Sequence, residues 1–361
     1  MNLADLPTPC LVLDRTILQR NIAHMAEAVG RHGVALRPHM KTAKSIDVAR
    51  LALVGQPGGI TVSTLAEAEY FSAHGVGDVL YAVGITPQKL DHVARLNAAG
   101  AHVTVLTDDP ETAAAIARHP QPPRTLIEID TGESRGGVLP DDRALLDIAK
   151  LLGPRLAGVM THAGHSYSGR SIAEIARIAE AERDGVVRAA ERLRAAGHAA
   201  PIVSMGSSPT ALHAESLAGI TEVRAGVYMF GDLFQSEIGT HGLQDIAVTV
   251  LTSVIGRRPG QILVDAGGLA LSKDRSTEAA PRDYGFGLVL NLAGQPIDGA
   301  IVRRAYQEHG VIGIDSSTFH VGDKLRIAPN HTCMTAAAHD RYHVVDGGDT
   351  VVGVWPRVNG W

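Results

Sequence analysis

The sequence reads DVLYAVG at residues 78–84, HVTVLT at 102–107 and TLIEID at 125–130. Each run is short, apolar and rich in β-branched residues, and stretches of helical periodicity separate the runs, which predicts strand–helix alternation. The pattern continues outward on both sides, and the further candidate strands are CLVLD (10–14), ALRPHMK (35–41), GITVST (59–64), LAGVMTHA (156–163) and PIVSMGS (201–207). This alternation predicts right-handed βαβ units and a parallel sheet. Eight units in about 230 residues fit a (β/α)₈ barrel, although a doubly wound open sheet has the same periodicity.

The pattern changes after about residue 240. Five strand-like runs follow, separated by Gly, Pro and Asp turns and without a long amphipathic helix: IAVTVLTSVIG (246–256), QILVDAGG (261–268), RRAYQEHGVIGID (303–315), DKLRIAP (323–329) and RYHVVDGGDTVVGVW (341–355). Such a succession of short strand-like runs and turns is typical of an all-β domain. The 361 residues also exceed the size of one ordinary core, about 250–300 residues. We therefore predict a barrel over residues 10–240 and a C-terminal β domain over residues 241–361, which residues 1–9 join.

Composition excludes several classes of protein. With 45% hydrophobic and 20% charged residues the chain is typical of a globular protein, and a net charge of −5 gives no reason to expect nucleic acid or an anionic membrane as partner. No apolar run reaches the roughly 18 residues that a bilayer span needs, and the N-terminus lacks the features of a signal peptide. Two cysteines, Cys10 and Cys333, cannot form a disulfide framework. A cytoplasmic location is expected.

Lys41 closes the second candidate strand, in RPHMKT (37–42). Active sites of barrels form where strands end and βα loops begin. An amine that an apolar strand end withdraws from water stays neutral, and is then a nucleophile for a Schiff base. The alternative interpretation is a lysine that extends into solvent at the strand end.

Two later strand ends carry further candidates. In EIDTGESRGGV (128–138), Arg135 is flanked by glycines that let a backbone approach a ligand closely, although an ordinary surface loop would look the same. In MTHAGHSYSGR (160–170), His162, His165 and Tyr167 could stack on an aromatic cofactor or relay protons. The alternative for these three side chains is that they cap loops or face solvent.

Two segments could hold a phosphate. VSMGSSPTALH (203–213) reads as a strand, a turn through Gly206, Ser207 and Ser208, and a helix start, and the N–H groups of such a terminus suit a dianion. The alternative is an ordinary serine N-cap. EVRAGVYMFGD (222–232) offers a second such place, at Arg224, Gly226, Val227 and Tyr228.

The last candidate is PNHTCMT (329–335), in which His331 and Cys333 are two residues apart. On a strand these positions face the same side, so an imidazole and a thiolate could share one cation, and Zn²⁺ prefers such ligands. Two protein ligands leave positions open for water and substrate, as in a catalytic site. An isolated His-x-Cys pair can also arise by chance.

Taken in order, LPTPCLVLD, RPHMKT, IEIDTGESRGGV, MTHAGHSY, GSSPT, RAGVYMFGD and PNHTC resemble the alanine-racemase-like (fold type III) PLP enzymes, and among them the D-serine dehydratase and D-threonine aldolase branch. The resemblance covers nearly the whole chain. It implies a barrel that carries pyridoxal 5′-phosphate, a β domain after it, and a homodimer. A D-β-hydroxy amino acid is the implied substrate.

The resemblance also assigns roles to individual residues. Lys41 is implied as the Schiff-base lysine, and Arg135 as the arginine beside the phenolate oxygen of the cofactor. The remaining implied contacts are His162 and Tyr167 with the ring, Gly206, Ser207, Gly226, Val227 and Tyr228 with the phosphate, and Arg224 with the pyridine nitrogen. His331 and Cys333 are implied as metal ligands, with Zn²⁺ first and Mn²⁺ or Mg²⁺ as alternatives.

One departure from the family separates this chain from racemases. Racemases carry a catalytic tyrosine early in the β domain, whereas this chain reads VDAGGLALSKD (264–274) there, without a tyrosine. Cys333 favours dehydration of the substrate over retro-aldol cleavage, because the aldolase branch more often has His-x-Asp. Two other readings stay open, namely a PLP-binding protein of cofactor homeostasis without turnover and a barrel enzyme without PLP.

Overall fold

The computed structural model describes residues 1–361, and it divides the chain into two compact units. One unit comprises Met1–Ala23 and Val227–Arg357, and the other comprises His24–Gly226 and Val358–Trp361. These boundaries differ from the predicted ranges 10–240 and 241–361. The start of the chain up to Ala23 groups with the β-rich part, and the last four residues group with the barrel. Each unit is described by itself below.

Eight parallel strands form the barrel unit, in the spatial order β2-β9-β8-β7-β6-β5-β4-β3. A parallel bridge between His39 and Thr61 connects the two ends of this sheet, so the barrel is nearly closed. The predicted fold class, a TIM-type barrel with an additional β domain, is confirmed. The strands are β2 Ala35–Pro38, β3 Ile60–Val62, β4 Asp78–Gly84, β5 His102–Thr107, β6 Thr125–Ile129, β7 Leu156–Thr161, β8 Ile202–Met205 and β9 Glu222–Ala225.

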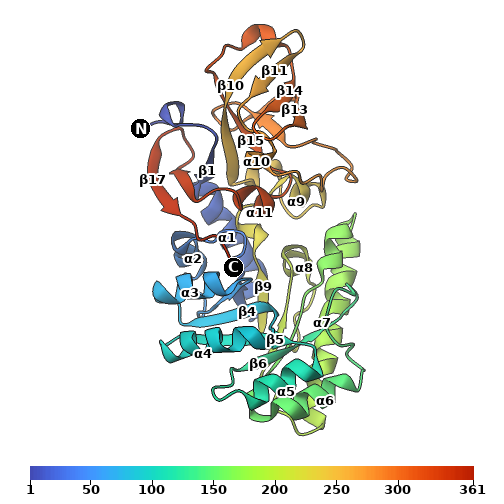
Figure 1. Ribbon diagram of the computed structural model, residues 1–361. Coiled ribbons are helices and arrows are strands. Elements are labelled where there is room, and N and C mark those ends of the chain that lie inside the picture. Colours follow the sequence, from blue (N-terminus) through green and yellow to red (C-terminus); the bar gives the residue numbers. More distant parts are fainter. The chain divides into compact units, whose positions relative to one another are not determined.

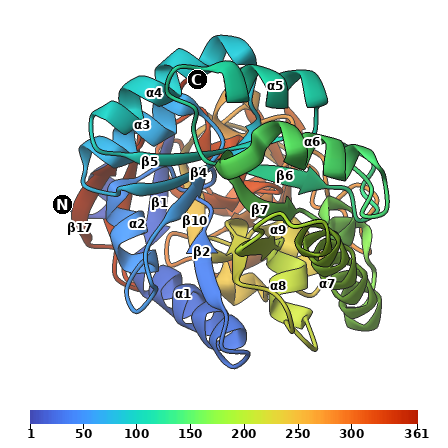
Figure 2. The same ribbon diagram turned by 90° about the horizontal axis from the view of Figure 1, so that it is seen from below.

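Helices surround the strands, as Figure 2 shows from one end of the barrel. The longest is α7, which begins after the N-cap Ser171, whose side chain accepts the N–H of Glu174. Its buried positions recur every three or four residues, as the sequence pattern predicted, and it ends just before Gly197. The helices, α7 included, are α1 Arg15–Gly30, whose residues up to Ala23 group with the β-rich unit, α2 Ile46–Ala52, α3 Leu65–Ala73, α4 Leu90–Ala98, α5 Pro110–Arg118, α6 Ala144–Leu152, α7 Ile172–Ala195 and α8 Ser208–His213.

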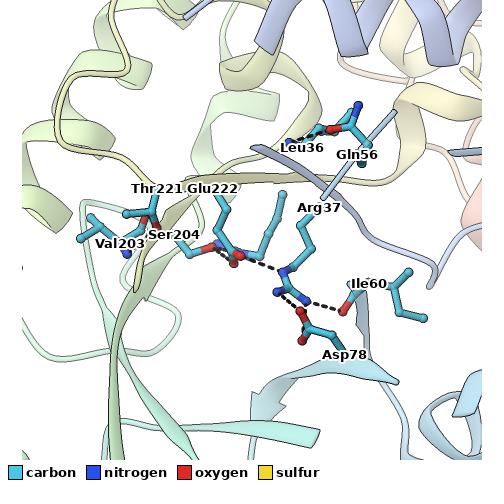
Figure 3. Close-up of polar contacts among 10 residues, drawn as sticks. Leu36, Arg37, Gln56, Ile60, Asp78, Val203, Ser204, Thr221 and Glu222 are labelled. Atoms are coloured by element: carbon cyan, nitrogen blue, oxygen red, sulfur yellow. Dashed lines mark hydrogen bonds and ion pairs between the residues drawn. The ribbon is translucent and has the colours of Figure 1, made fainter. Parts of the chain in front are cut away.

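A network of charged side chains joins four strands of the barrel; Arg37 and Glu222 are buried in it, and Asp78 is half exposed (Figure 3). Arg37 on β2 donates from Nε to Oε2 of Glu222 on β9 at 2.8 Å, and from Nη2 to Oδ2 of Asp78 on β4 at 2.8 Å. Glu222 Oε1 accepts the hydroxyl of Ser204 on β8 at 2.7 Å. Buried charges need such partners, because an unpaired ion in the interior is expensive. The network therefore fixes four strands of the barrel relative to one another.

Nine strands form the β-rich unit, in the order β11-β14-β13-β12-β15-β10-β1-β16-β17, with a further pairing between β10 and β11 (Figure 1). Because of that pairing, the six strands from β11 to β10 close into a ring. The strands are β1 Cys10–Asp14, β10 Val248–Arg258, β11 Gln261–Val264, β12 Leu288–Leu290, β13 Pro296–Ala305, β14 Gly310–Gly313, β15 Lys324–Ala328, β16 Arg341–Val345 and β17 Val351–Pro356. Three short helices accompany them, α9 Leu233–Glu237, α10 Gly268–Leu271 and α11 Thr332–Ala336.

One predicted strand lies in the other unit. CLVLD (10–14) was assigned to the barrel, but it is β1, which pairs antiparallel with β10 and parallel with β16. All five of its residues are buried, so its apolar run looks the same as that of a barrel strand. The eighth barrel strand is β9 instead. No helix of the structure combines the length and the apolar character that a membrane span requires.

The buried network gives a first prediction. Replacing Arg37 by Met leaves Glu222 without its cation, and should lower the free energy of unfolding by about 3–5 kcal/mol in urea titrations. Arg143→Met is the matched control, since Arg143 is 90% exposed and lies 3.7 Å from Asp147, and such pairs contribute about 0.2–1 kcal/mol. Equal losses in the two variants would contradict the structural role of the interior network.

Candidate active site

Lys41 lies beyond the strand that was predicted to contain it. β2 ends at Pro38, and Lys41 follows three residues later in a turn with its side chain exposed. Of the two interpretations of Lys41, the one in which its side chain extends into solvent at the strand end describes this structure. The backbone N–H of Lys41 donates to Nδ1 of His39 at 3.4 Å, and His39 itself is held by the carbonyl of Ala225 at 2.7 Å. The backbone around Lys41 is thus anchored, whereas its amine is accessible to a reactant.

His162 follows the end of β7 in the same unit. Burial, together with the positive charge of Lys41, lowers its pKa to about 3, so the imidazole is neutral at pH 7. Its Nδ1 lies 2.9 Å from the carbonyl oxygen of Gly206. A carbonyl only accepts, so Nδ1 carries the proton and Nε2 does not. The ring of Tyr167 lies 6.4 Å from that of His162, centre to centre, at 48°.

Arg224 on β9 is 3% exposed. Its Nε donates to the hydroxyl of Ser204 at 2.8 Å, and its Nη2 donates to the carbonyl of Thr161. The charges of Arg224 and Lys41 both contribute to the lowered pKa of His162, after burial, which is the largest cause. Lys41, His162 and Arg224 therefore lie in one neighbourhood of the barrel unit.

The predicted phosphate turn has partners of its own. Glu182 on α7 is fully buried, and its Oε1 accepts the N–H of Ala163 at 2.9 Å and that of Gly206 at 3.0 Å. Ser207 is the N-cap of α8 and exchanges hydrogen bonds with Thr210 in a capping box. The alternative interpretation of an ordinary serine cap therefore describes Ser207 in this structure. Burial raises the pKa of Glu182, and its hydrogen bonds oppose that effect.

Glycine is required at Gly206 and at the second predicted phosphate segment. Gly206 has φ +131°, and a Cβ there would lie 2.4 Å from the carbonyl oxygen of Arg224. A Cβ on Gly226 would lie 2.7 Å from the carbonyl oxygen of His39. Gly226 is buried, and its N–H has no hydrogen-bond acceptor in the chain. Buried N–H groups are almost always satisfied, so this one suits an anionic ligand.

The other predicted residues are more scattered. Arg135 is exposed and lies 3.3 Å from Glu133, its ion-pair partner. His165 keeps a buried Nδ1 without a hydrogen-bond partner. Val227 and Tyr228 belong to the β-rich unit, so the boundary between the units separates them from Gly226. Tyr228 is buried, which raises its pKa.

The pair His331 and Cys333 lies in the β-rich unit, in a helix start and not on a strand. His331 is the N-cap of α11 and Cys333 is in its first turn, and the two side chains still meet. Nδ1 of His331 lies 3.2 Å from Oδ2 of Asp274. Burial opposes protonation of His331, but the bonds to Asp274 and Cys333 outweigh it and raise its pKa to about 11.

This pair fits a metal ion in its donor chemistry. A metal-bound histidine commonly donates its other ring N–H to a carboxylate, and Asp274 holds Nδ1 of His331 in that way, which leaves Nε2 for a cation beside the Cys333 sulfur. No group of three or more His, Cys, Asp or Glu side chains that could hold a metal occurs in residues 1–361.

Sequence reasoning missed Glu182 and Asp274. A signal for Glu182 was present, because it lies on the buried stripe of α7, between Ala179 and Val186. A lone carboxylate among buried positions indicates a specific partner. For Asp274 no local signal exists, since its partner is 57 residues away in the chain.

Comparisons with known proteins agree with these features. Residues 13–233 match the family model "Alanine racemase, N-terminal domain", and residues 247–345 match "Putative serine dehydratase domain". D-threo-3-hydroxyaspartate dehydratase from Delftia sp. (strain HT23) is 44% identical over 99% of each chain. Its solved structure matches with a TM-score of 0.97 at 43% identity and covers 100% of both chains. A cysteine-to-alanine variant of it, in the metal-free form, has the same TM-score.

Two further relatives have different activities. D-serine dehydratase from Dictyostelium discoideum is 30% identical over 99% of this chain and 98% of its own. 3-Hydroxy-D-aspartate aldolase from Paracoccus denitrificans (strain Pd 1222) is 33% identical over 99% of this chain and 92% of its own. The two family models together span most of the chain, and the family expected from the sequence is confirmed. The chain therefore belongs to the alanine-racemase-like (fold type III) PLP enzymes and, within them, to the D-serine dehydratase family.

Proposed function

We propose that this chain is a PLP- and metal-dependent lyase, working as a homodimer, that removes water from D-β-hydroxy amino acids such as D-threo-3-hydroxyaspartate and D-serine. The products are a 2-oxo acid and ammonia. The observation that carries this proposal is the 44% identity to a D-threo-3-hydroxyaspartate dehydratase over 99% of both chains. The presence of Lys41, His331 and Cys333 in one chain supports it, since the reaction needs an amine for the cofactor and a site for a cation.

We assign the cofactor to Lys41, and PLP bound there supplies an electron sink that makes the Cα–H bond acidic. Lys41 Nζ would also be the group that accepts the Cα proton of the substrate. His162 presents an unprotonated Nε2, because its Nδ1–H is committed to Gly206, and Gly226 offers its buried N–H to the phosphate. Arg224 stays fixed by Ser204 and Thr161. These contacts would hold the cofactor and the reacting bond in one orientation.

We assign the cation to His331 and Cys333. Zn²⁺ suits an imidazole and a thiolate best, with Mn²⁺ or Mg²⁺ as alternatives, and such a cation supplies Lewis acidity that helps the β-hydroxyl to leave. Asp274 keeps the Nδ1 of His331 protonated, so that Nε2 stays available as the ligand. Loss of the Cα proton and of the hydroxyl, then addition of water and loss of ammonia, leaves the 2-oxo acid.

A second candidate is retro-aldol cleavage to glycine and an aldehyde. The aldolase from Paracoccus denitrificans, 33% identical over 99% of this chain, favours it. The cysteine at position 333 favours dehydration. A role in cofactor homeostasis alone does not account for the β-rich unit, because a carrier of PLP needs neither that unit nor its His-x-Cys pair.

The cofactor assignment predicts the behaviour of Lys41→Ala. The purified wild-type protein should show the absorption band of lysine-bound PLP, and the variant should lose it together with about 10²–10⁴-fold of turnover. Lys150→Ala is the control, because Lys150 is an exposed lysine of α6. After reduction with borohydride, mass spectrometry should find the cofactor on the peptide that contains Lys41. A band that persists in Lys41→Ala would refute the assignment.

The metal assignment predicts that loss of the metal abolishes turnover but leaves the absorption band of PLP unchanged. Chelation, His331→Ala and Cys333→Ala should each abolish turnover, whereas the PLP band should stay. Met334→Ala should behave as wild type, since Met334 lies beside Cys333 and is 55% exposed. Bound metal can be counted directly by elemental analysis. Full turnover in metal-free protein would remove His331 and Cys333 from the reaction.

The reaction type is tested by its products. Incubation with D-serine, D-threonine and D-3-hydroxyaspartate should release ammonia and the matching 2-oxo acid in equal amounts. Accumulation of glycine and an aldehyde would instead establish the aldolase alternative. Binding of PLP without turnover of any of the three substrates would support the homeostasis alternative.

A further inference from the structure

A cavity of about 450 Å³ lies within the β-rich unit, and none of the residues in the proposed mechanism lines it. Its volume is within the range of small-molecule sites, about 300–1,000 Å³. One wall is apolar and includes Ile246, Leu288 and Leu290, which belong to a buried hydrophobic cluster. The cavity is therefore large enough for a small ligand, and its apolar wall can pack against an apolar group of that ligand.

The pairing of four strands places two opposite charges beside that wall. Residues that are paired across strands, or two apart on one strand, point to the same face of a sheet. By this register Asp14 on β1, Thr249 on β10, Arg326 on β15 and Leu290 on β12 share one face. All four residues line the cavity. The polar end and the apolar end of the cavity are thus set by the same sheet.

Both charged side chains are almost completely buried, with Arg326 5% and Asp14 6% exposed. Arg326 uses Nε for Thr249 at 2.9 Å, and its two Nη atoms have no acceptor in the chain. Asp14 uses Oδ1 for the N–H groups of Thr16 and Ile17, at 2.9 and 3.2 Å, and its Oδ2 has no donor. No ion pair joins the two side chains, although Asp14 attracts the Arg326 charge. Two buried charges with unused hydrogen-bonding atoms face one cavity.

Gly294 limits the space around the guanidinium of Arg326 at the polar end of the cavity. A Cβ on Gly294, which has φ +83°, would lie 3.1 Å from Nη1 of Arg326, so only a glycine leaves the guanidinium uncrowded there. The free edge of a guanidinium is a planar fork that matches a carboxylate. A carboxylate alone would leave Asp14 without a partner, and an amine alone would leave Arg326 without one. A ligand with both groups satisfies both side chains.

We propose that this cavity binds a small apolar α-amino acid as its zwitterion, as a second amino-acid site separate from the catalytic residues. The carboxylate of the ligand lies on Arg326, its ammonium group lies on Oδ2 of Asp14, and its side chain packs against Leu288 and Leu290. The cavity contributes one positive and one negative group, so a neutral zwitterion leaves no charge unpaired. This site does not depend on the proposed lyase reaction.

The ligand chemistry is tested on the holoenzyme by calorimetric titration with L-leucine, 4-methylpentanoate and 3-methylbutylamine. The two analogues keep the apolar chain, and each lacks one charged group. Leucine should bind at least tenfold more tightly than either analogue, with the absorption band of the cofactor unchanged. An analogue that binds as tightly as leucine, or no heat from any of the three compounds, overturns the proposal.

The location is tested with variants. Arg326→Met and Asp14→Asn should each weaken leucine binding at least tenfold, and asparagine still caps the start of α1. Ala293→Trp provides a variant outside the core, because Ala293 is exposed at the edge of the cavity, and it should block entry to the same extent. Val321→Trp, at a 66% exposed position in the same unit, should bind leucine as wild type does. Unaltered leucine binding in Arg326→Met and Ala293→Trp overturns the assignment.

Discussion

Glu222 joins Arg37 and Ser204 in the barrel (Figure 3), and through Ser204 it supports Arg224, one of the residues that we assign to the cofactor. One of its oxygens accepts Arg37 Nε at 2.8 Å, and the other accepts the hydroxyl of Ser204 at 2.7 Å. The same hydroxyl accepts Nε of Arg224, which also holds the carbonyl of Thr161 at the end of β7. Charge-assisted bonds in a buried place are strong and directional. The ends of β7 and β9 are therefore fixed before any ligand binds.

Glu182, on helix α7, fixes the two loops that follow β7 and β8. Its carboxylate accepts the N–H of Ala163 after β7 and that of Gly206 after β8, and Gly206 in turn accepts Nδ1 of His162. The buried carboxylate thus positions Gly206, whose carbonyl oxygen sets which nitrogen of His162 carries the proton. Rigid support of this kind is what a site needs to hold reacting bonds in a productive geometry.

Much of the barrel could be predicted from sequence because its strands and helices have distinct local periods. The failures have a physical reason. β1 is buried on all five positions, and its partners β10 and β16 lie more than 200 residues away, so nothing local separates it from a barrel strand. The sequence left open whether Lys41 is shielded or extends into solvent, because the exact end of β2, at Pro38, could not be read from its apolar run. His331 and Cys333 were proposed as a pair because residues two apart on a strand face the same side. The segment instead forms the start of helix α11, where that rule does not apply.

The stretch from residue 264 to residue 274 illustrates how one framework supports different chemistry. Racemases carry a catalytic tyrosine in this stretch, whereas this chain has no tyrosine there. The stretch ends instead at Asp274, whose carboxylate lies 3.2 Å from Nδ1 of His331. The absence of a tyrosine and the presence of an aspartate beside His331, which we assign to the metal, both agree with the reaction that we propose. In the reaction we propose, proton transfer at Cα then rests with Lys41, and His331 is committed to the leaving group at Cβ.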